Sequence, residues 1–269
     1  LYLFEKLIKE TGSIVADANI PEIRKIKKIS RKKKINLDLI LDKYKGIQLI
    51  SHKFENERQI LSIRFRGKKY DFKLNLIGKL QIKNLLMAIL CAAKNGIKLN
   101  NIIKILHKIK PVEGRLEKIG SIKNNSRVIL DYAHTPIALE TTLKNLKEQF
   151  PSSKISLVFG CGGDRDFKKR FAMGKIAEKY SNKIYLTDDN PRNENPSKIR
   201  KEIKRGIKKT KILEITKRNE AIYRAINELN SGDLLLVAGK GHEKTQDYGT
   251  KNFFFSDQEE ILKSIKIKN

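Results

Sequence analysis

The sequence predicts an α/β fold with a mostly parallel sheet over residues 113–269, and three observations lead to this class. Apolar, strand-like runs alternate with helical patterns throughout this half of the chain. The links between them are short, as they are in βαβ units. The run Leu234–Ala238 is continuously apolar, which is typical of a strand buried on both faces of a parallel sheet. Together these observations favour a Rossmann-like sheet.

The individual elements of this half follow from the periodicity of apolar residues. Strands are predicted at Arg127–Tyr132, Ile155–Gly160, Lys183–Thr187, Lys211–Ile215 and Leu234–Gly239, with a further one at Phe253–Phe255. Helices are predicted at residues 137–149, 168–180, 197–208, 218–229 and 257–266.

Residues 1–112 are predicted to form a separate domain, because Pro111-Val-Glu-Gly114 interrupts the helical pattern. The elements expected in it are helices at Leu1–Lys9, Gly78–Asn95 and Leu99–Lys108, a strand at Gly12–Ala16 and a β-hairpin over Gln59–Leu76. Residues 19–45 are a lysine-rich helix-and-loop stretch whose individual elements we do not assign.

Composition narrows the class of protein. No apolar run approaches the roughly 20 residues that span a bilayer, so no membrane insertion is expected. The first residues, Leu1–Lys6, lack the features of a signal peptide and have the pattern of a mid-helix segment, so we expect the chain to be a fragment. Two cysteines, Cys91 and Cys161, provide neither metal spacing nor a disulfide framework, which favours a reducing cytoplasm.

The formal charge of +28 has two explanations. One is nucleic-acid binding. The other is compositional bias, because lysine, isoleucine and asparagine dominate together and all have A/T-rich codons. The lysines are scattered and are not interleaved with stacking aromatic residues. We therefore expect no specific nucleic-acid partner.

The segment Asp188-Asp-Asn-Pro-Arg192 follows a predicted strand directly, where open α/β sheets bind ligands. Pro191 fixes its own φ and restricts Asn190 to an extended conformation, so the turn is stiff. An arginine fork can hold a carboxylate, and a neighbouring aspartate can accept an ammonium group. The segment is therefore suited to an amino-acid head group; the alternative is a polar loop with a surface ion pair.

Three other loops at predicted strand ends carry unusual polar residues: Asp131–Pro136, Gly160–Asp166 and Gly239–Glu243. Their glycines allow backbone N–H groups to approach a ligand. Neither glycine-rich loop matches a dinucleotide fingerprint or a phosphate-binding P-loop. Because loops after parallel strands meet at one sheet edge, these residues are expected to converge.

Single residues in these loops leave alternatives open. His134 is either a catalytic base or a structural or ligand-binding group. Cys161 is either a nucleophile near a helix N-terminus or a small buried thiol in a turn. Cys91 falls on an apolar helical face and is expected in the core.

Five motifs in this order and spacing resemble the Mur ligases: Gly114-Arg115, Asp131-Tyr-Ala-His-Thr-Pro136, Phe159-Gly-Cys-Gly-Gly-Asp-Arg-Asp166, Asp188-Asp-Asn-Pro-Arg192 and Gly239-Lys-Gly-His-Glu243. The resemblance is dense over 113–269 and looser over 1–112. It implies that 113–269 is the family's C-terminal Rossmann-like, amino-acid-binding domain. It also implies that 1–112 is the last part of the central P-loop-type α/β ATPase domain, with the P-loop itself missing.

The resemblance implies a reaction as well. Family members use ATP and Mg²⁺ to activate a carboxylate as an acyl phosphate, which the amine of an incoming amino acid attacks. Here the expected substrates are UDP-MurNAc-L-Ala-D-Glu and meso-diaminopimelate, with lysine-adding or other Mur-type ligases as the alternative. A monomer is expected. No catalytic residue or metal ligand is assigned, since the phosphate loop and catalytic lysine would lie upstream, and the chain by itself is expected to be inactive.

Site residues are carried over from the resemblance in two groups. The diaminopimelate-binding positions are Arg165, Asp189, Asn190, Pro191, Arg192, Gly239 and Glu243. The ATP-binding positions are Asn84, Arg115, Asp131 and His134. Near Asn84 the chain has Leu80 and Gln81, where the family usually has phenylalanine and asparagine.

Overall fold

The computed structural model describes residues 12–40, 46–55 and 57–269. The chain divides into two units, Leu1–Lys110 and Pro111–Asn269, two residues before the boundary predicted after residue 112. The helix predicted over Leu1–Lys9 lies outside the described residues.

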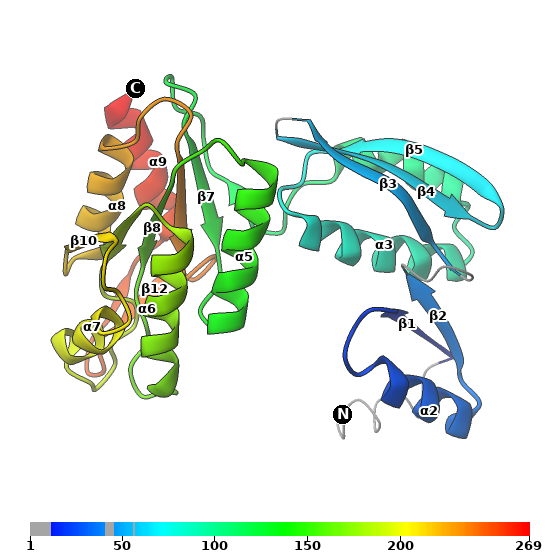
Figure 1. The fold of residues 1–269 in the computed structure, drawn as a ribbon, viewed down its shortest axis with the longest axis horizontal. Helices are drawn as coiled ribbons and strands as arrows, with labels where there is room; N and C mark the ends of the chain where they lie inside the picture. The colour runs from blue at the N-terminus through cyan, green and yellow to red at the C-terminus, as the bar shows by residue number, and fades with distance from the viewer. Residues whose placement is uncertain (1–11, 41–45, 56) are drawn as a thin grey trace. The chain divides into compact units, whose positions relative to one another are not determined.

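The second unit contains a six-stranded sheet in the order β10-β9-β8-β11-β7-β6 (Figure 1). Its strands are β6 (Glu117–Lys118), β7 (Arg127–Asp131), β8 (Ile155–Phe159), β9 (Lys183–Leu186), β10 (Lys211–Glu214) and β11 (Leu234–Ala238). All neighbours pair in parallel except β6, which runs antiparallel to β7. The predicted mostly parallel sheet is therefore confirmed, and β6 is an edge strand that the sequence did not reveal.

Helices cover both faces of this sheet (Figure 1). They are α5 (Pro136–Gln149), α6 (Lys168–Tyr180), α7 (Pro196–Lys204), α8 (Arg218–Asn227) and α9 (Asp257–Lys268). Helices α8 and α9 bury Ile222 and Ile261 in one core with Leu130 and Val237 of the sheet. On the other face, Leu143 of α5 is fully buried.

Two predictions for this unit need correction. The strand near Phe253 is β13 (Asn252–Phe254), which pairs antiparallel with β12 (Thr245–Asp247) in a separate ribbon. Helix α7 ends at Lys204, earlier than predicted, and Gly206 just beyond it packs against the backbone of α6. A Cβ at Gly206 would lie 2.4 Å from the carbonyl oxygen of Phe171.

The helices begin where the sequence supplies N-terminal caps. The Thr135 hydroxyl accepts a hydrogen bond from the Ala138 N–H at 3.3 Å, and Pro136 occupies the first turn of α5. The Asn195 side chain caps α7 in the same way, with Pro196 following it. Capping residues followed by proline fix helix starts. The segments just before them are therefore held at the edge of the sheet.

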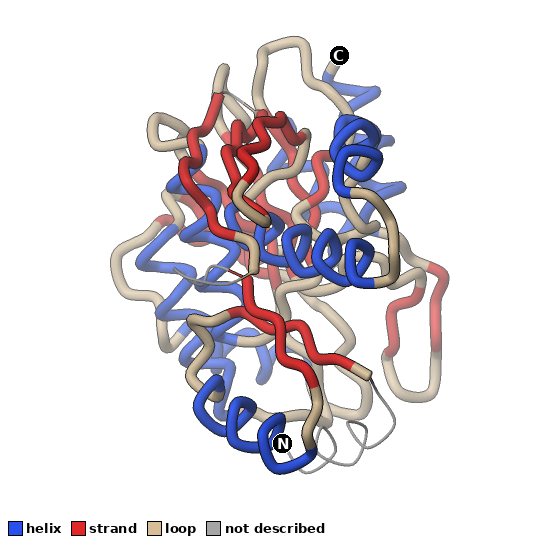
Figure 2. Tube along the Cα trace, turned by 90° about the vertical axis from the view of Figure 1, so that its right-hand side faces the viewer, coloured by secondary structure: helices blue, strands red, loops and turns tan. Residues whose placement is uncertain are grey.

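The first unit contains β1 (Ser13–Asp17), α2 (Ile23–Lys33), β2 (Asn36–Ile40), β3 (Gln48–Glu55), β4 (Arg58–Phe65), β5 (Lys68–Leu74), α3 (Lys79–Lys94), α4 (Leu99–Ile105) and the 3₁₀ turn η2 (Leu106–Lys108). The predicted hairpin is confirmed as β4 and β5, and β3 adds a third antiparallel strand. Helix α2 packs against the parallel pair β1 and β2, seen near the N-terminus in Figure 2.

One core prediction in this unit is wrong. Cys91 is exposed on α3. The buried stripe of α3 instead runs through Ile82, Leu86, Ile89 and Leu90. Cys91 lies just past the edge of this stripe, because successive helical residues are about 100° apart.

Candidate functional site

The loops that follow β7, β8, β9 and β11 meet at the carboxyl edge of the sheet. The N–H of Gly163 donates to the carbonyl of Asn190 at 2.9 Å, which joins the loops after β8 and β9. The N–H of Gly239 donates to the carbonyl of Asp131 at 3.1 Å, which joins the loops after β11 and β7. Strand β11 lies between β7 and β8. Such a reversal of strand order opens a crevice where α/β sheets bind ligands.

Asp189 has a buried carboxylate oxygen with no partner. The residue is 8% exposed, and Oδ2 has no hydrogen bond within the part of the chain that the structure describes. This oxygen faces Gly239, where a Cβ would lie 2.6 Å from it. Leaving a buried carboxylate oxygen unpaired is costly. An ammonium group from a ligand would satisfy it.

The neighbouring Asp188 has a different, structural role. It forms an ion pair with Arg200 and accepts a hydrogen bond from the Tyr248 hydroxyl at 3.2 Å. Burial raises the pKa of Asp188, and Arg200 opposes this shift. Arg200 also pairs with Glu214 at 2.9 Å. Of the two adjacent carboxylates, only Asp189 is available to a ligand.

Asn190 is central to a second group of side chains. Its Nδ2 donates to Glu243 Oε2 at 3.0 Å, and its Oδ1 accepts from Lys240 Nζ at 2.9 Å. The N–H of Asp247 also donates to Oδ1, at 3.1 Å. Both polar atoms of the amide are thus hydrogen-bonded, which fixes the Asn190 side chain. The predicted residues Asn190 and Glu243 are in direct contact.

Arg192 adopts an unusual backbone conformation with φ of 52°. Its Nη1 donates to the carbonyl of Gly163 at 2.8 Å, and its Nε lies 3.4 Å from Asp247 Oδ2. The side chain is 23% exposed. A guanidinium has five N–H donors, so these contacts leave donors for a ligand carboxylate. A left-handed non-glycine residue held by such contacts is a frequent feature of functional sites.

Tyr132 is a functional candidate that sequence reasoning missed. Its hydroxyl donates to Glu243 Oε1 at 3.2 Å. The Arg115 guanidinium lies 4.6 Å from its ring centroid, and the His134 ring contacts it edge-on, with centroids 4.6 Å apart. Two predicted ATP-binding residues therefore meet on one aromatic ring, whose hydroxyl is also linked through Glu243 to Asn190, the neighbour of Asp189.

Asp131 is buried next to these residues. Its carboxylate accepts hydrogen bonds from the N–H groups of Leu116 at 2.7 Å and Ala133 at 3.0 Å, and from the Thr142 hydroxyl at 3.1 Å. Burial raises the pKa of Asp131, and these donors oppose the shift. A carboxylate has about four acceptor positions, so one remains for a further donor.

Two of the predicted site residues, Arg165 and Asn84, are exposed side chains. Arg165 is exposed, with the carbonyl of Asp164 at 3.5 Å as its hydrogen-bond partner. Asn84 is exposed on α3, in the first unit. Cys161 is buried, and burial raises its pKa to about 12. This burial agrees with the second alternative, a small buried thiol in a turn.

An ion pair between a buried arginine and a partly exposed glutamate, which the sequence did not reveal, braces two of the loops. Arg170 is fully buried and binds both oxygens of Glu194, at 2.8 and 2.9 Å. Its Nη2 also donates to the carbonyl of Gly162 at 3.2 Å. Glu194 in turn accepts from the N–H of Asp164 at 2.7 Å. The pair therefore ties the loop after β8 to the loop after β9.

This brace predicts a pH dependence. Its hydrogen bonds with Arg170 lower the pKa of Glu194 to about 2, below the ~4.3 of an unfolded glutamate. The stabilisation is present above the unfolded pKa and is lost as the pH falls through the folded one. We expect Glu194→Gln to melt at a lower temperature than the wild type near pH 6. As the pH falls from about 5 to about 3, its melting temperature should fall less than that of the wild type. Differential scanning fluorimetry measures the melting temperature at each pH.

The control is Glu220→Gln, because Glu220 and Lys217 form an exposed surface pair, and such pairs contribute little. It should match the wild type at every pH. Equal acid slopes for Glu194→Gln and the wild type would contradict the assigned role of the brace.

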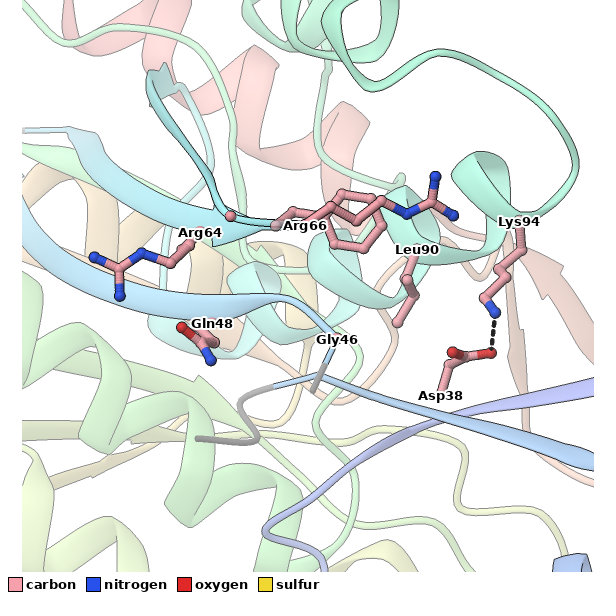
Figure 3. A pocket seen from close by; sticks show the side chains of 9 residues that line it. Asp38, Gly46, Gln48, Arg64, Arg66, Leu90 and Lys94 are labelled. Atoms are coloured by element: carbon pink, nitrogen blue, oxygen red, sulfur yellow. Dashed lines mark ion pairs between the residues drawn. The ribbon is translucent and has the colours of Figure 1, made fainter. Parts of the chain in front are cut away.

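A separate cavity of about 310 Å³ lies in the first unit (Figure 3). Lys94 and Asp38 form an ion pair at 2.8 Å on its wall, near Arg66. No predicted site residue lines this cavity. In the described residues, no group of three or more His, Cys, Asp or Glu side chains could hold a metal ion. Among the same residues, no helix is long and apolar enough to cross a membrane.

Comparisons with known proteins agree with this architecture. Residues 114–241 match the family profile described as Mur ligase, glutamate ligase domain. The UDP-N-acetylmuramoyl-L-alanyl-D-glutamate–2,6-diaminopimelate ligase of Rickettsia montanensis is 39% identical over 268 residues, 99% of this chain and 55% of that protein. A solved structure of a ligase with the same name has a TM-score of 0.69 at 26% identity and covers 99% of this chain and 56% of its own.

A more distant structure shares the fold alone. The MurF ligase from Thermotoga maritima, solved in complex with ADP, has a TM-score of 0.67 at 16% identity, and the match covers 96% of this chain and 54% of that one.

The sheet, the loops at its carboxyl edge and these matches define the class of protein. The chain belongs to the Mur ligase family. This confirms the resemblance drawn from the five motifs. The relatives named for diaminopimelate addition match nearly all of the chain, which itself spans about half of their length.

Proposed function

We propose that this chain supplies the amino-acid pocket and part of the ATP site of a ligase that adds meso-diaminopimelate to UDP-MurNAc-L-Ala-D-Glu, an ATP-dependent step in peptidoglycan precursor synthesis. The names of the relatives support the reaction. The observation that carries the pocket is the unpaired, buried Oδ2 of Asp189 beside Gly239. It lies on the same stiff turn as Arg192, so one turn offers an acceptor for an ammonium and a fork for a carboxylate.

These groups suit the far end of meso-diaminopimelate, which carries an ammonium and a carboxylate on one carbon. In the proposed complex, Asp189 and Glu243 accept from the ammonium, and Arg192 donates to the carboxylate. Lysine lacks this carboxylate. A lysine ligand would leave the Arg192 donors unmatched, and sites built for a polar group reject analogues that lack it.

The ATP side of the proposal rests on Arg115, Asp131 and His134. Arg115 and His134 are exposed next to Tyr132, and Asp131 retains one acceptor position, so these residues fit a polar nucleotide. ATP would supply the phosphoryl group that activates the glutamate carboxylate. Asn84 belongs to the first unit and stays an assignment by resemblance. Mg²⁺ belongs to the proposal by resemblance alone, since the described residues contain no group of three or more His, Cys, Asp or Glu side chains that could hold a metal ion, and we derive no step through it.

Two further assignments belong to the same proposal. We assign residues 1–112 to the end of the central ATPase domain and 113–269 to the C-terminal domain. The profile match over 114–241 supports the second assignment. A cytoplasmic, monomeric enzyme is part of the proposal as well.

Calorimetric titration of the 269-residue chain with meso-diaminopimelate and with L-lysine tests the pocket. We expect meso-diaminopimelate to bind more tightly, and Asp189→Asn to weaken both ligands because both carry the distal ammonium. Gln59→Ala, in the first unit, serves as a control that leaves the pocket untouched. Binding of neither amino acid, or equal binding of both by the wild type, would refute the proposal.

A further inference from the structure

Lys240 is a fully buried lysine in contact with two residues of the proposed amino-acid site. Its side chain is 0% exposed, although lysine is almost never fully buried unless it is paired. The ammonium donates to Asn190 Oδ1 at 2.9 Å and to Glu243 Oε2 at 3.1 Å. Both acceptors belong to residues assigned to the amino-acid ligand, whereas Lys240 itself has no assigned role.

The charge of Lys240 acts on Glu243. Burial raises the pKa of Glu243, but Lys240, Asn190 and Tyr132 outweigh this effect and lower it. Both oxygens of Glu243 accept hydrogen bonds, Oε1 from Tyr132 and Oε2 from Asn190 and Lys240, so the Lys240 ammonium balances the charge of this carboxylate. Asp189 Oδ2, in contrast, has no hydrogen-bond partner among the residues that the structure describes.

We propose that Lys240 is a specificity-determining positioning residue, whose buried charge balances Glu243 and so tunes the pocket for a zwitterionic rather than a cationic amino-acid end. This inference rests on the proposed function, because it assumes that the pocket binds an amino acid. With Lys240 present, Asp189 and Arg192 face the ligand with opposite charges, which matches an ammonium and a carboxylate. Without it, the pocket becomes more negative by one charge, which favours the purely cationic end of lysine.

The test is a double-mutant cycle on the 269-residue chain, with the ratio of the Kd for L-lysine to the Kd for meso-diaminopimelate as the readout. Lys240→Met keeps the length of the side chain and removes the charge. Glu243→Gln keeps the shape of the side chain and removes the opposite charge. The double variant restores the balance of charge.

The two single variants are expected to move the ratio in opposite directions. Lys240→Met should lower it by at least about tenfold, the scale expected for one nearby charge. Glu243→Gln should raise it, and the double variant should return close to the wild-type ratio. A merely structural role for Lys240 would lower the melting temperature and leave the ratio unchanged.

The outcomes separate the two proposals. If the wild type prefers meso-diaminopimelate and Lys240→Met leaves the ratio unchanged, or moves it in the same direction as Glu243→Gln, the inference is wrong and the pocket stands. If the wild type binds neither amino acid, both are wrong. Should Lys240→Met fail to fold, an unchanged or lower ratio in Glu243→Gln still overturns the inference.

Discussion

Gly239→Ala is expected to abolish binding of meso-diaminopimelate. Gly239 has φ of 117°, and a Cβ there would lie 2.6 Å from Asp189 Oδ2, the oxygen that we assign to the ligand ammonium. Asp189 cannot move away easily, because its backbone carbonyl accepts a hydrogen bond from Gln246 Nε2 at 2.8 Å. The added methyl group therefore takes the place of the ligand. We expect an affinity loss of at least ~100-fold by calorimetry, the scale of a buried charged contact that is no longer made.

Gly232→Ala is the matched control. Gly232 also has positive φ, 77°, but a Cβ there would meet no atom within 4 Å. Both variants carry the backbone penalty of a left-handed alanine, about 1–2 kcal/mol, so both should melt at a lower temperature. Only Gly239→Ala should lose the ligand. Equal affinities in the two variants would show that the space beside Asp189 is not the ligand site.

Arg192→Ala is expected to remove the preference for meso-diaminopimelate over L-lysine. The guanidinium is the group that we assign to the distal carboxylate, and a hydrogen bond to a charged group contributes about 1.5–3 kcal/mol. The affinity for meso-diaminopimelate should therefore fall roughly 10- to 150-fold. The affinity for L-lysine should change little, because lysine has no carboxylate at that end. Competition calorimetry with the two amino acids gives both values.

The backbone at this position requires two controls. Because φ of Arg192 is 52°, alanine is strained there and glycine is not. Arg192→Gly should therefore be more stable than Arg192→Ala and equally unselective. Arg192→Lys keeps the charge but loses the planar fork, so its selectivity should be intermediate. Retained selectivity in both the alanine and the glycine variants would exclude Arg192 as the carboxylate clamp.

Much of the fold of the second unit could be predicted because its signals are local. A continuous apolar run such as Leu234–Ala238 is sufficient to predict a strand buried on both faces. Threonine or asparagine followed by proline marks the starts of α5 and α7. Strand β6 was missed because two residues carry no periodicity.

The first unit was predicted less completely. Strand β3 is half-exposed along its length, so its pattern lacks a clear apolar face. Helix α2 buries Ile26 and Ser30 and is otherwise rich in lysine, so the individual elements within residues 19–45 could not be assigned from the sequence. Where few side chains are buried, the sequence carries little periodic signal.

The sequence by itself determined the alternation of strands and helices, the convergence of the loops at one sheet edge and the motif residues that point to the family. The tertiary structure alone decided which of those residues meet. It separated Asp188 from Asp189 by pairing only the first, and it buried Lys240 against Asn190, which lies 50 positions away. The physical reason is that periodicity and turn chemistry act over a few residues, whereas the partners of a buried charge come from wherever the folded chain brings them together.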